Sequence, residues 1–155
     1  MKKALIAGLV LSLTIYFLSF NDTTSYKDGD VIFQTTAGET GKAIQLATHS
    51  KYNHCGVLFF ENNEWIVYEA VQPVKKTTLK EFNARGKGTV KRLSNKVLST
   101  EDITKLKAQF KKYEHKNYDE AFNWSDDQIY CSELVYKLYY NALHIELCKP
   151  RKLSD

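Results

Sequence analysis

The sequence predicts a single globular domain that combines α-helices with β-strands. Its length of 155 residues suits one hydrophobic core. Apolar residues make up 43% of the chain and aromatic residues 13%, a composition typical of folded proteins. Apolar residues recur with both helical and alternating periods, so helices and strands are expected together.

The first elements follow a turn signal. Asp28-Gly29-Asp30 precedes the apolar residues 31–33, which are predicted to form a strand. Residues 38–48 then place apolar side chains at helical spacing and predict a short amphipathic helix. The apolar positions of this helix are Ala43, Ile44, Leu46 and Ala47.

The middle of the chain predicts a β-hairpin. Residues 54–60 and 65–71 are rich in β-branched and aromatic residues, and four polar residues separate them. Centring the turn on Asn62 and Asn63 fixes the expected register of the two strands. Pro73 then closes the second strand.

The second half of the chain is predicted to be mainly helical. Residues 88–93 form one further strand. Ser99 and Asp102 have the spacing of a capping box, and the helix that they open ends before an aromatic-rich, irregular stretch at 116–130. The buried side of this helix is expected to hold Ile103, Leu106, Phe110 and Tyr113. A last amphipathic helix begins at Cys131.

The N-terminus predicts export. Lys2 and Lys3 precede an uncharged, mostly apolar run at 4–20. Small residues of a cleavage site are missing around its end, and roughly 17 residues is near the shortest length that spans a bilayer. Residues 1–20 are therefore predicted to be a signal peptide or an N-terminal membrane anchor, with the domain at 21–155 in the cell envelope, the periplasm or outside the cell.

The positive charge does not indicate a nucleic-acid partner. The formal net charge is +4. Much of it comes from lysines that alternate with the apolar positions of a predicted helix, which is typical of a solvated helix face. These residues are Lys105, Lys107, Lys111 and Lys112.

The cysteines suggest a chemically active thiol. The chain has three, Cys55, Cys131 and Cys148, so at least one stays free, whereas secreted disulfide scaffolds use a denser and even set. Cys131 is placed at a helix start, where free N–H groups and the helix dipole stabilise a thiolate. Taken alone, however, it is more often a small buried hydrophobe.

The hairpin register brings a histidine and a carboxylate together. Gly56 is expected to face Glu69 across the hairpin, and His54 lies two residues before Gly56 on the same face of the strand. His54 and Glu69 are therefore diagonal neighbours within reach of one hydrogen bond. Alone they would more often be a structural pair or surface residues, but with a helix-start Cys131 they predict a Cys-His-Glu site.

Several separated stretches of the sequence resemble one known family. The chain is similar to the permuted papain-like, NlpC-type enzymes of the YiiX-like group. Each stretch is a weak motif alone, but the His54 and Glu69 motifs precede the Cys131 motif, and this order points to the permuted branch. The stretches are GDVIFQ at 29–34, KAIQLATHS at 42–50, NHCGV at 53–57, YEA at 68–70 and YCSELV at 130–135.

This resemblance implies an α+β, permuted papain-like (NlpC-type) fold. In such a fold a small antiparallel sheet packs against helices, and the nucleophile stands at a helix N-terminus. The resemblance also implies an exported cysteine hydrolase of the amidase or peptidase type, without a cofactor. Cys131 would form an acyl-thioester, His54 would be its base and Glu69 would orient the imidazole.

Three groups are candidates for binding the oxyanion or the substrate. The backbone N–H of Cys131 is the first, and Gln34 and Tyr118 are side-chain candidates. Gln34 is equally well explained as a turn residue at the end of its strand. Trp124 and Tyr130 could line a substrate groove, although packing against the core is the preferred explanation.

Cys55 departs from the pattern of the family, which usually has an aliphatic residue there. Strand alternation points its side chain to the face opposite His54. We therefore expect a buried structural thiol and not a second nucleophile. Cys148 has no motif around it and is also expected to be structural.

The sequence does not choose between several classes of substrate. A small peptide, another amide or an acyl lipid all fit, with membrane association through residues 4–20. An acyltransferase of the same fold and a non-enzymatic envelope binding protein are alternatives. A zinc site is disfavoured because no metal-binding spacing supports it, and the oligomeric state is not predicted. The residues that could have served as zinc ligands are His49, His54, Cys55, Glu69 and Cys131.

Overall fold

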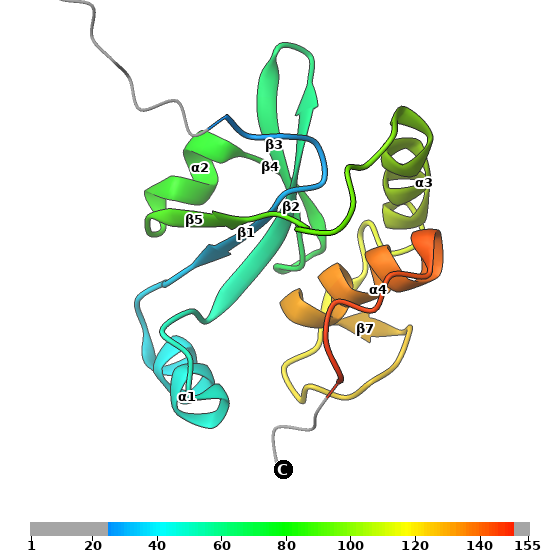
Figure 1. The fold of residues 1–155 in the computed structure, drawn as a ribbon. Helices are drawn as coiled ribbons and strands as arrows, with labels where there is room; N and C mark the ends of the chain where they lie inside the picture. Colours follow the sequence, from blue (N-terminus) through cyan, green and yellow to red (C-terminus); the bar gives the residue numbers. More distant parts are fainter. Residues whose placement is uncertain (1–24, 151–155) are drawn as a thin grey trace, which may run out of the picture.

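A computed structural model describes residues 25–150 of the chain, so the predicted signal or anchor segment lies outside the described residues. Five strands form its central antiparallel sheet, in the order β4-β3-β2-β1-β5 (Figure 1). The strands are β1 (Val31–Gln34), β2 (His54–Glu61), β3 (Glu64–Glu69), β4 (Lys75–Thr78) and β5 (Gly88–Lys91). Between residues 25 and 150, no helix has the length and apolarity needed to cross a membrane.

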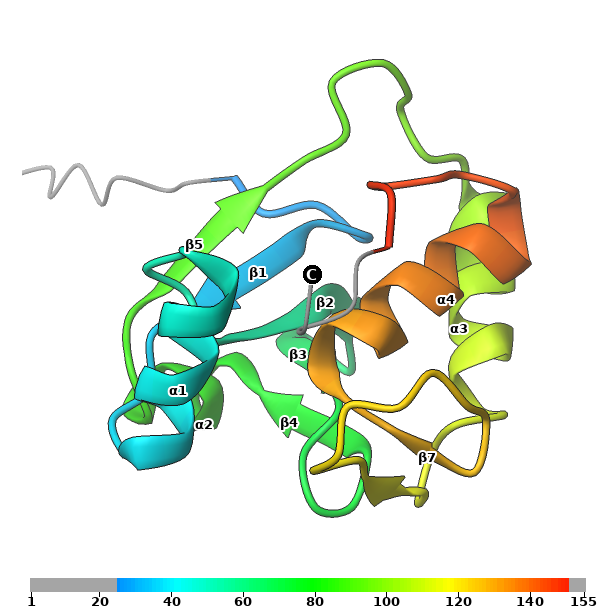
Figure 2. The same ribbon diagram turned by 90° about the horizontal axis from the view of Figure 1, so that it is seen from below.

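Helices cover both faces of the sheet. Figure 1 shows α2 on one side and α3 with α4 on the other, while Figure 2 shows α1 beyond the end of the sheet. A short parallel pair, β6 (Asn117–Tyr118) and β7 (Gln128–Ile129), lies before α4. The helices are α1 (Glu39–Thr48), α2 (Leu79–Ala84), α3 (Thr100–Phe110) and α4 (Cys131–Leu143). This arrangement is the predicted α+β fold.

Strand alternation divides the interior into two hydrophobic clusters. On β2, Val57 and Phe59 point to the side of α3 and α4, and Leu58 points to the side of α2. The larger cluster therefore contains the apolar sides of α3 and α4. The smaller one is closed by Phe82 of α2.

The predicted hairpin register is confirmed. Gly56 pairs with Glu69, and Asn62 and Asn63 occupy the two-residue turn with positive φ angles of 49° and 67°. Asparagine tolerates this left-handed conformation, which a two-residue hairpin turn of the I′ type requires. The turn therefore sets which side chains of β2 and β3 share a face.

Other boundaries differ from the prediction. The strand β3 ends at Glu69 and not at Val71, and β5 ends at Lys91. The polar segment between β3 and β5, for which no helix or strand was predicted, forms β4 and α2. The segment is polar because β4 is an outer strand of the sheet and α2 buries only Phe82. It therefore lacks the apolar periodicity that would have predicted a strand and a helix.

The predicted amphipathic helix α1 exists, but its apolar side chains do not enter the core. Leu46 is 75% exposed, and only Gly41 of the helix is buried. Gly41 packs so closely against Asn53 that an added Cβ would lie 2.4 Å from the Asn53 side-chain nitrogen. Helix α1 thus contacts the rest of the domain through the close approach of its backbone at Gly41 to Asn53. Its apolar side chains lie outside the buried core.

Candidate active site

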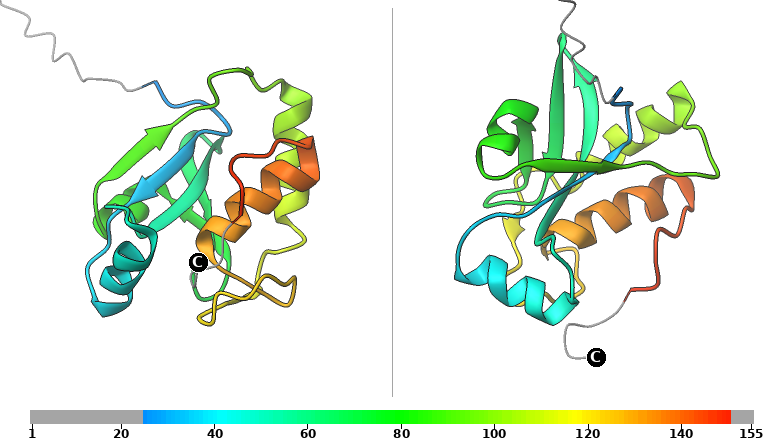
Figure 3. Two further views of the ribbon diagram at one scale, coloured as in Figure 1. Left: turned by 60° about the horizontal axis from the view of Figure 1, so that its bottom comes forward. Right: turned by 60° about the vertical axis from the view of Figure 1, so that its left-hand side comes forward.

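The helix α4 begins at Cys131, as predicted. The carboxylate of Glu133 accepts a hydrogen bond from the backbone N–H of Tyr130, which caps the helix. The Cys131 residue is 6% exposed. Helix α4, which it opens, packs beside β2 (Figure 3). A nearly buried thiol thus stands at the helix end that carries free backbone N–H groups.

His54 and Glu69 lie side by side, as the hairpin register requires. The distance from His54 Nε2 to Glu69 Oε2 is 2.5 Å. Because Glu69 engages Nε2, Nδ1 is the nitrogen left available to Cys131. The His54 ring also stacks on Phe82 of α2, with the ring centroids 5.7 Å apart. The hydrogen bond to Glu69 and the stacking on Phe82 therefore fix the orientation of the His54 imidazole.

Arg85 is a member of this cluster that the sequence did not reveal. It follows α2, and its Nη2 lies 2.6 Å from Oε1 of Glu69. The Glu69 side chain is fully buried, so the guanidinium supplies a positive charge that offsets its desolvation. No local motif marks Arg85, because its partner is sixteen residues earlier in the chain.

These contacts favour an ion pair between Cys131 and His54. A hydrogen bond from Cys55 and the adjacent imidazolium hold the pKa of the Cys131 thiol well below its ordinary value, although burial acts in the opposite direction. Burial alone would lower the pKa of His54, but its contacts with Cys131 and Glu69 raise the pKa to about 9. The arrangement is that of an activated thiol.

The structure separates the two side-chain candidates for oxyanion binding. The Tyr118 hydroxyl lies within hydrogen-bonding reach of both the thiol and the backbone N–H of Cys131, and burial and the Cys131 charge raise its pKa. Gln34 is fully buried, and its amide donates to the carbonyls of Phe82, at 2.5 Å, and Gly86. These bonds commit the Gln34 amide nitrogen to holding the end of α2.

A groove of about 1270 Å³ opens at Cys131. Its walls are the loop at 121–126, one side of α4, and Ile44 and Thr48 of α1. The aromatic residues along it are Phe122, Trp124, Tyr130, Tyr136 and Tyr140. Of the apolar residues of α1, Ile44 lines this groove.

Trp124 and Tyr130 line the groove, which differs from the preferred prediction of core packing. Trp124 is 51% exposed and meets Tyr136 edge-on, with the ring centroids 5.4 Å apart. Lys137 of α4 holds the loop that carries Trp124, because its ammonium lies 2.5 Å from the carbonyl oxygen of Ser125. A lysine on α4 therefore fixes the groove wall beside the thiol.

Cys55 is buried, as predicted, but it is not isolated. It lies on the face of β2 that α4 covers, and its thiol is within hydrogen-bonding reach of the Cys131 thiol. The contact and the burial of the residue raise the pKa of Cys55 well above its ordinary value. A protonated thiol therefore sits beside the one that is favoured as a thiolate.

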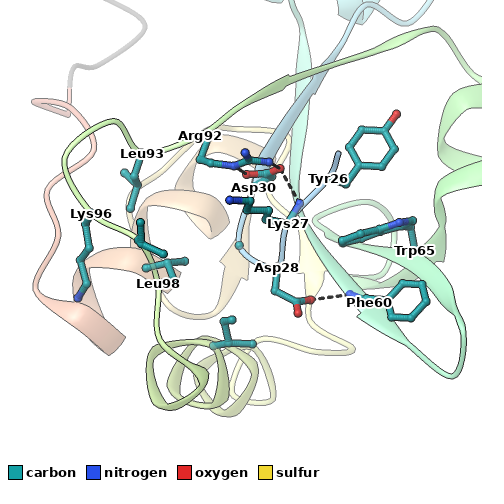
Figure 4. A pocket seen from close by; sticks show the side chains of 13 residues that line it. Tyr26, Lys27, Asp28, Asp30, Phe60, Trp65, Arg92, Leu93, Lys96 and Leu98 are labelled. Carbon is teal, nitrogen blue, oxygen red and sulfur yellow. Dashed lines mark hydrogen bonds and ion pairs between the residues drawn. The ribbon is translucent and has the colours of Figure 1, made fainter. Parts of the chain in front are cut away.

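A second hollow of about 480 Å³ lies away from Cys131, beside the outer end of the hairpin. Figure 4 shows its ion pair between Arg92 and Asp30, together with Trp65 and Phe60 on the opposite wall. The Arg92 Nε lies 2.6 Å from Oδ1 of Asp30, which is itself buried. This pair saturates the carboxylate, and the residues lining the hollow include no cysteine or histidine.

The fold places a histidine on β2 and a cysteine at the start of α4, in the order expected of a permuted papain-like protein. Residues 25–155 match the family described as "Permuted papain-like amidase enzyme, YaeF/YiiX, C92 family". The chain belongs to this permuted papain-like family, and this membership supports a cysteine hydrolase type of function.

Two comparisons agree with this assignment. The chain is 43% identical to YiiX of Escherichia coli (strain K12) over 150 residues, which are 95% of this chain and 73% of that protein. It also resembles a crystal structure described as metalloprotein YiiX from Escherichia coli O157:H7. That match has a TM-score of 0.77 and 46% identity, and it covers 81% of this chain and 71% of the other.

The structure of the relative is described as that of a metalloprotein, and the described donor groups of this chain differ from such a site. Within residues 25–150, no cluster of three or more His, Cys, Asp or Glu side chains is arranged to hold a metal ion. Near Cys131, Glu69 is already shared between His54 and Arg85. The described residues therefore do not fit a metal site.

Proposed function

We propose that this protein is an exported cysteine amidase in which Cys131, His54 and Glu69 form the catalytic triad. The observation that carries the proposal is the continuous line of contacts from the Cys131 thiol through His54 and Glu69 to Arg85. A triad needs a nucleophile, a base and a group that orients the base, and this line supplies one of each.

In the proposed reaction, the Cys131 thiolate attacks the carbonyl carbon of an amide or ester. The resulting tetrahedral oxyanion is stabilised by the backbone N–H of Cys131 and the hydroxyl of Tyr118. These two donors face the same thiol, and Tyr118 is the side chain that we favour over Gln34. The His54 imidazolium then gives its proton to the leaving amine or alcohol, and water hydrolyses the acyl-thioester.

We propose that the acyl part of the substrate lies in the aromatic groove. Flat side chains on the loop, on α4 and near Ile44 of α1 suit the apolar part of a peptide or an acyl chain. Product analysis separates hydrolysis from acyl transfer, since only transfer yields a new amide or ester. Export is proposed from the charged start and apolar run at 1–20.

The test of the triad is alkylation of the three cysteines with limiting iodoacetamide across a pH series. An ordinary thiol is mostly protonated at about pH 6, but the lowered pKa of Cys131 keeps it a thiolate paired with His54 up to a pH of about 9. We expect selective labelling of Cys131 at about pH 6, slowed about tenfold or more by His54→Ala. Equal labelling of the three cysteines, or none, would favour a binding role for this fold.

A second expected result concerns Arg85. Replacing it with methionine removes a positive charge from buried Glu69, so the Glu69 pKa rises and the carboxylate protonates at a higher pH. The acid limb of Cys131 labelling should then shift upward by about one pH unit, and Arg85→Lys should restore part of it. Arg92→Met is a matched control, because it also removes an arginine from a buried carboxylate, that of Asp30, but at a site away from Cys131. An unchanged acid limb in Arg85→Met would remove Arg85 from the proposal.

A further inference from the structure

The neighbour of Cys131 on the sheet is a second thiol. Cys55 follows His54 along β2, so the two adjacent side chains approach the nucleophile from opposite faces of the strand. Cys55 and Cys131 belong to the same buried cluster, at 5% and 6% exposure. Helix α4 starts at Cys131 and packs on β2, the strand that carries Cys55, and both cysteines are free.

The two thiols differ in their access to solutes. Cys131 lies on the wall of the 1270 Å³ groove, whereas Cys55 is not among the residues that line it. A small oxidant that enters the groove therefore meets Cys131 first. The pKa of Cys131 is lowered and that of Cys55 is raised, so the partner that lines the groove is the reactive thiolate and the other partner is a thiol.

We propose that Cys55 is a resolving thiol, which captures Cys131 as a reversible disulfide when a peroxide oxidises the nucleophile. The inference uses the Cys131 thiolate of the proposed function but goes beyond hydrolysis. The disulfide removes the nucleophile from the active site and protects it from irreversible oxidation, and a dithiol reductant returns both cysteines to the reduced form.

Oxidation of Cys131 and formation of the disulfide are two separate steps. The Cys131 thiolate attacks one oxygen of hydrogen peroxide, so an S–O bond forms, the O–O bond breaks, and two electrons pass from sulfur to the peroxide. The hydroxide released takes the proton of the His54 imidazolium and leaves as water. Cys55 then attacks the sulfenic sulfur, an S–S bond forms, the S–O bond breaks, and the second hydroxide leaves with the Cys55 proton as water.

The experiment treats the reduced full-length protein with a small molar excess of hydrogen peroxide, blocks remaining thiols with iodoacetamide, and maps the peptides without reduction. We expect a peptide cross-linked through Cys55 and Cys131, the loss of Cys131 labelling at about pH 6, and recovery of both after dithiothreitol. Cys148→Ser should behave like the wild type. Cys55→Ser should instead accumulate two oxygen atoms on Cys131 that dithiothreitol does not remove.

Two results would overturn the inference in the wild-type protein itself, whatever the variants do. One is Cys131 carrying two or three oxygen atoms while Cys55 stays fully alkylatable, and the other is a disulfide that joins Cys131 to Cys148. The labelling profile before oxidation keeps this test separate from the proposed function. Selective labelling of Cys131 without a later cross-link refutes only the resolving role, while absence of selective labelling refutes the triad.

Discussion

Cys131→Ala is expected to abolish hydrolysis, with a fall in kcat/KM of about 10⁴-fold or more, because it removes the atom that forms the acyl-enzyme. The measurement is turnover of acyl p-nitrophenyl esters and aminoacyl p-nitroanilides, using the probes that the wild-type protein cleaves. The residue is the first of α4, and alanine removes only one sulfur atom from the core cluster to which Cys131 belongs. The variant should therefore fold.

Two further substitutions make this expectation specific. Cys131→Ser keeps a hydroxyl at the site but should also be inactive, because the surroundings that stabilise a thiolate cannot ionise an alcohol of much higher pKa. Cys148→Ala removes an exposed thiol outside the active site and should keep full activity. Appreciable hydrolysis by Cys131→Ala would transfer the nucleophilic role to another residue, with Cys55 the first to test.

The parts of the fold that the sequence predicted are those with strong local signals. Asn62 and Asn63 set the hairpin, and the hairpin alone places His54 diagonal to Glu69. The segment before β5 lacked an apolar period, so β4 and α2 were missed. A capping box of Thr78 and Glu81 does mark the start of α2 and would have been the signal for it.

The missed features of the site depend on contacts between distant segments. Alternation along β2 correctly turned Cys55 away from the His54 face, but it could not say that the start of α4 covers the other face. Arg85 likewise reaches Glu69 only because α2 folds back over the sheet. In the same way, Ile44 of α1 becomes part of the groove only when α1 lies beside α4 and the loop at 121–126.

Glu69→Gln is expected to lower kcat/KM by about 10² to 10⁴-fold while leaving the fold intact. The carboxylate accepts from His54 Nε2 at 2.5 Å and from Arg85 Nη2 at 2.6 Å. A glutamine can satisfy Arg85 with its carbonyl oxygen, and its NH₂ group then faces Nε2. A donor there forces Nε2 to be the acceptor, so the proton moves to Nδ1, the nitrogen that should receive the proton of Cys131.

The substitution therefore tests the tautomer and not only the charge. Besides the fall in turnover, selective labelling of Cys131 at about pH 6 should weaken, because loss of the Glu69 charge lowers the pKa of His54 from about 9. Glu61→Gln is the matched control, since Glu61 also binds cations, Lys76 and Lys107, at the far end of the hairpin. If Glu69→Gln kept both turnover and labelling, His54 would have to be oriented by its stacking on Phe82, and the third member of the triad would fall away.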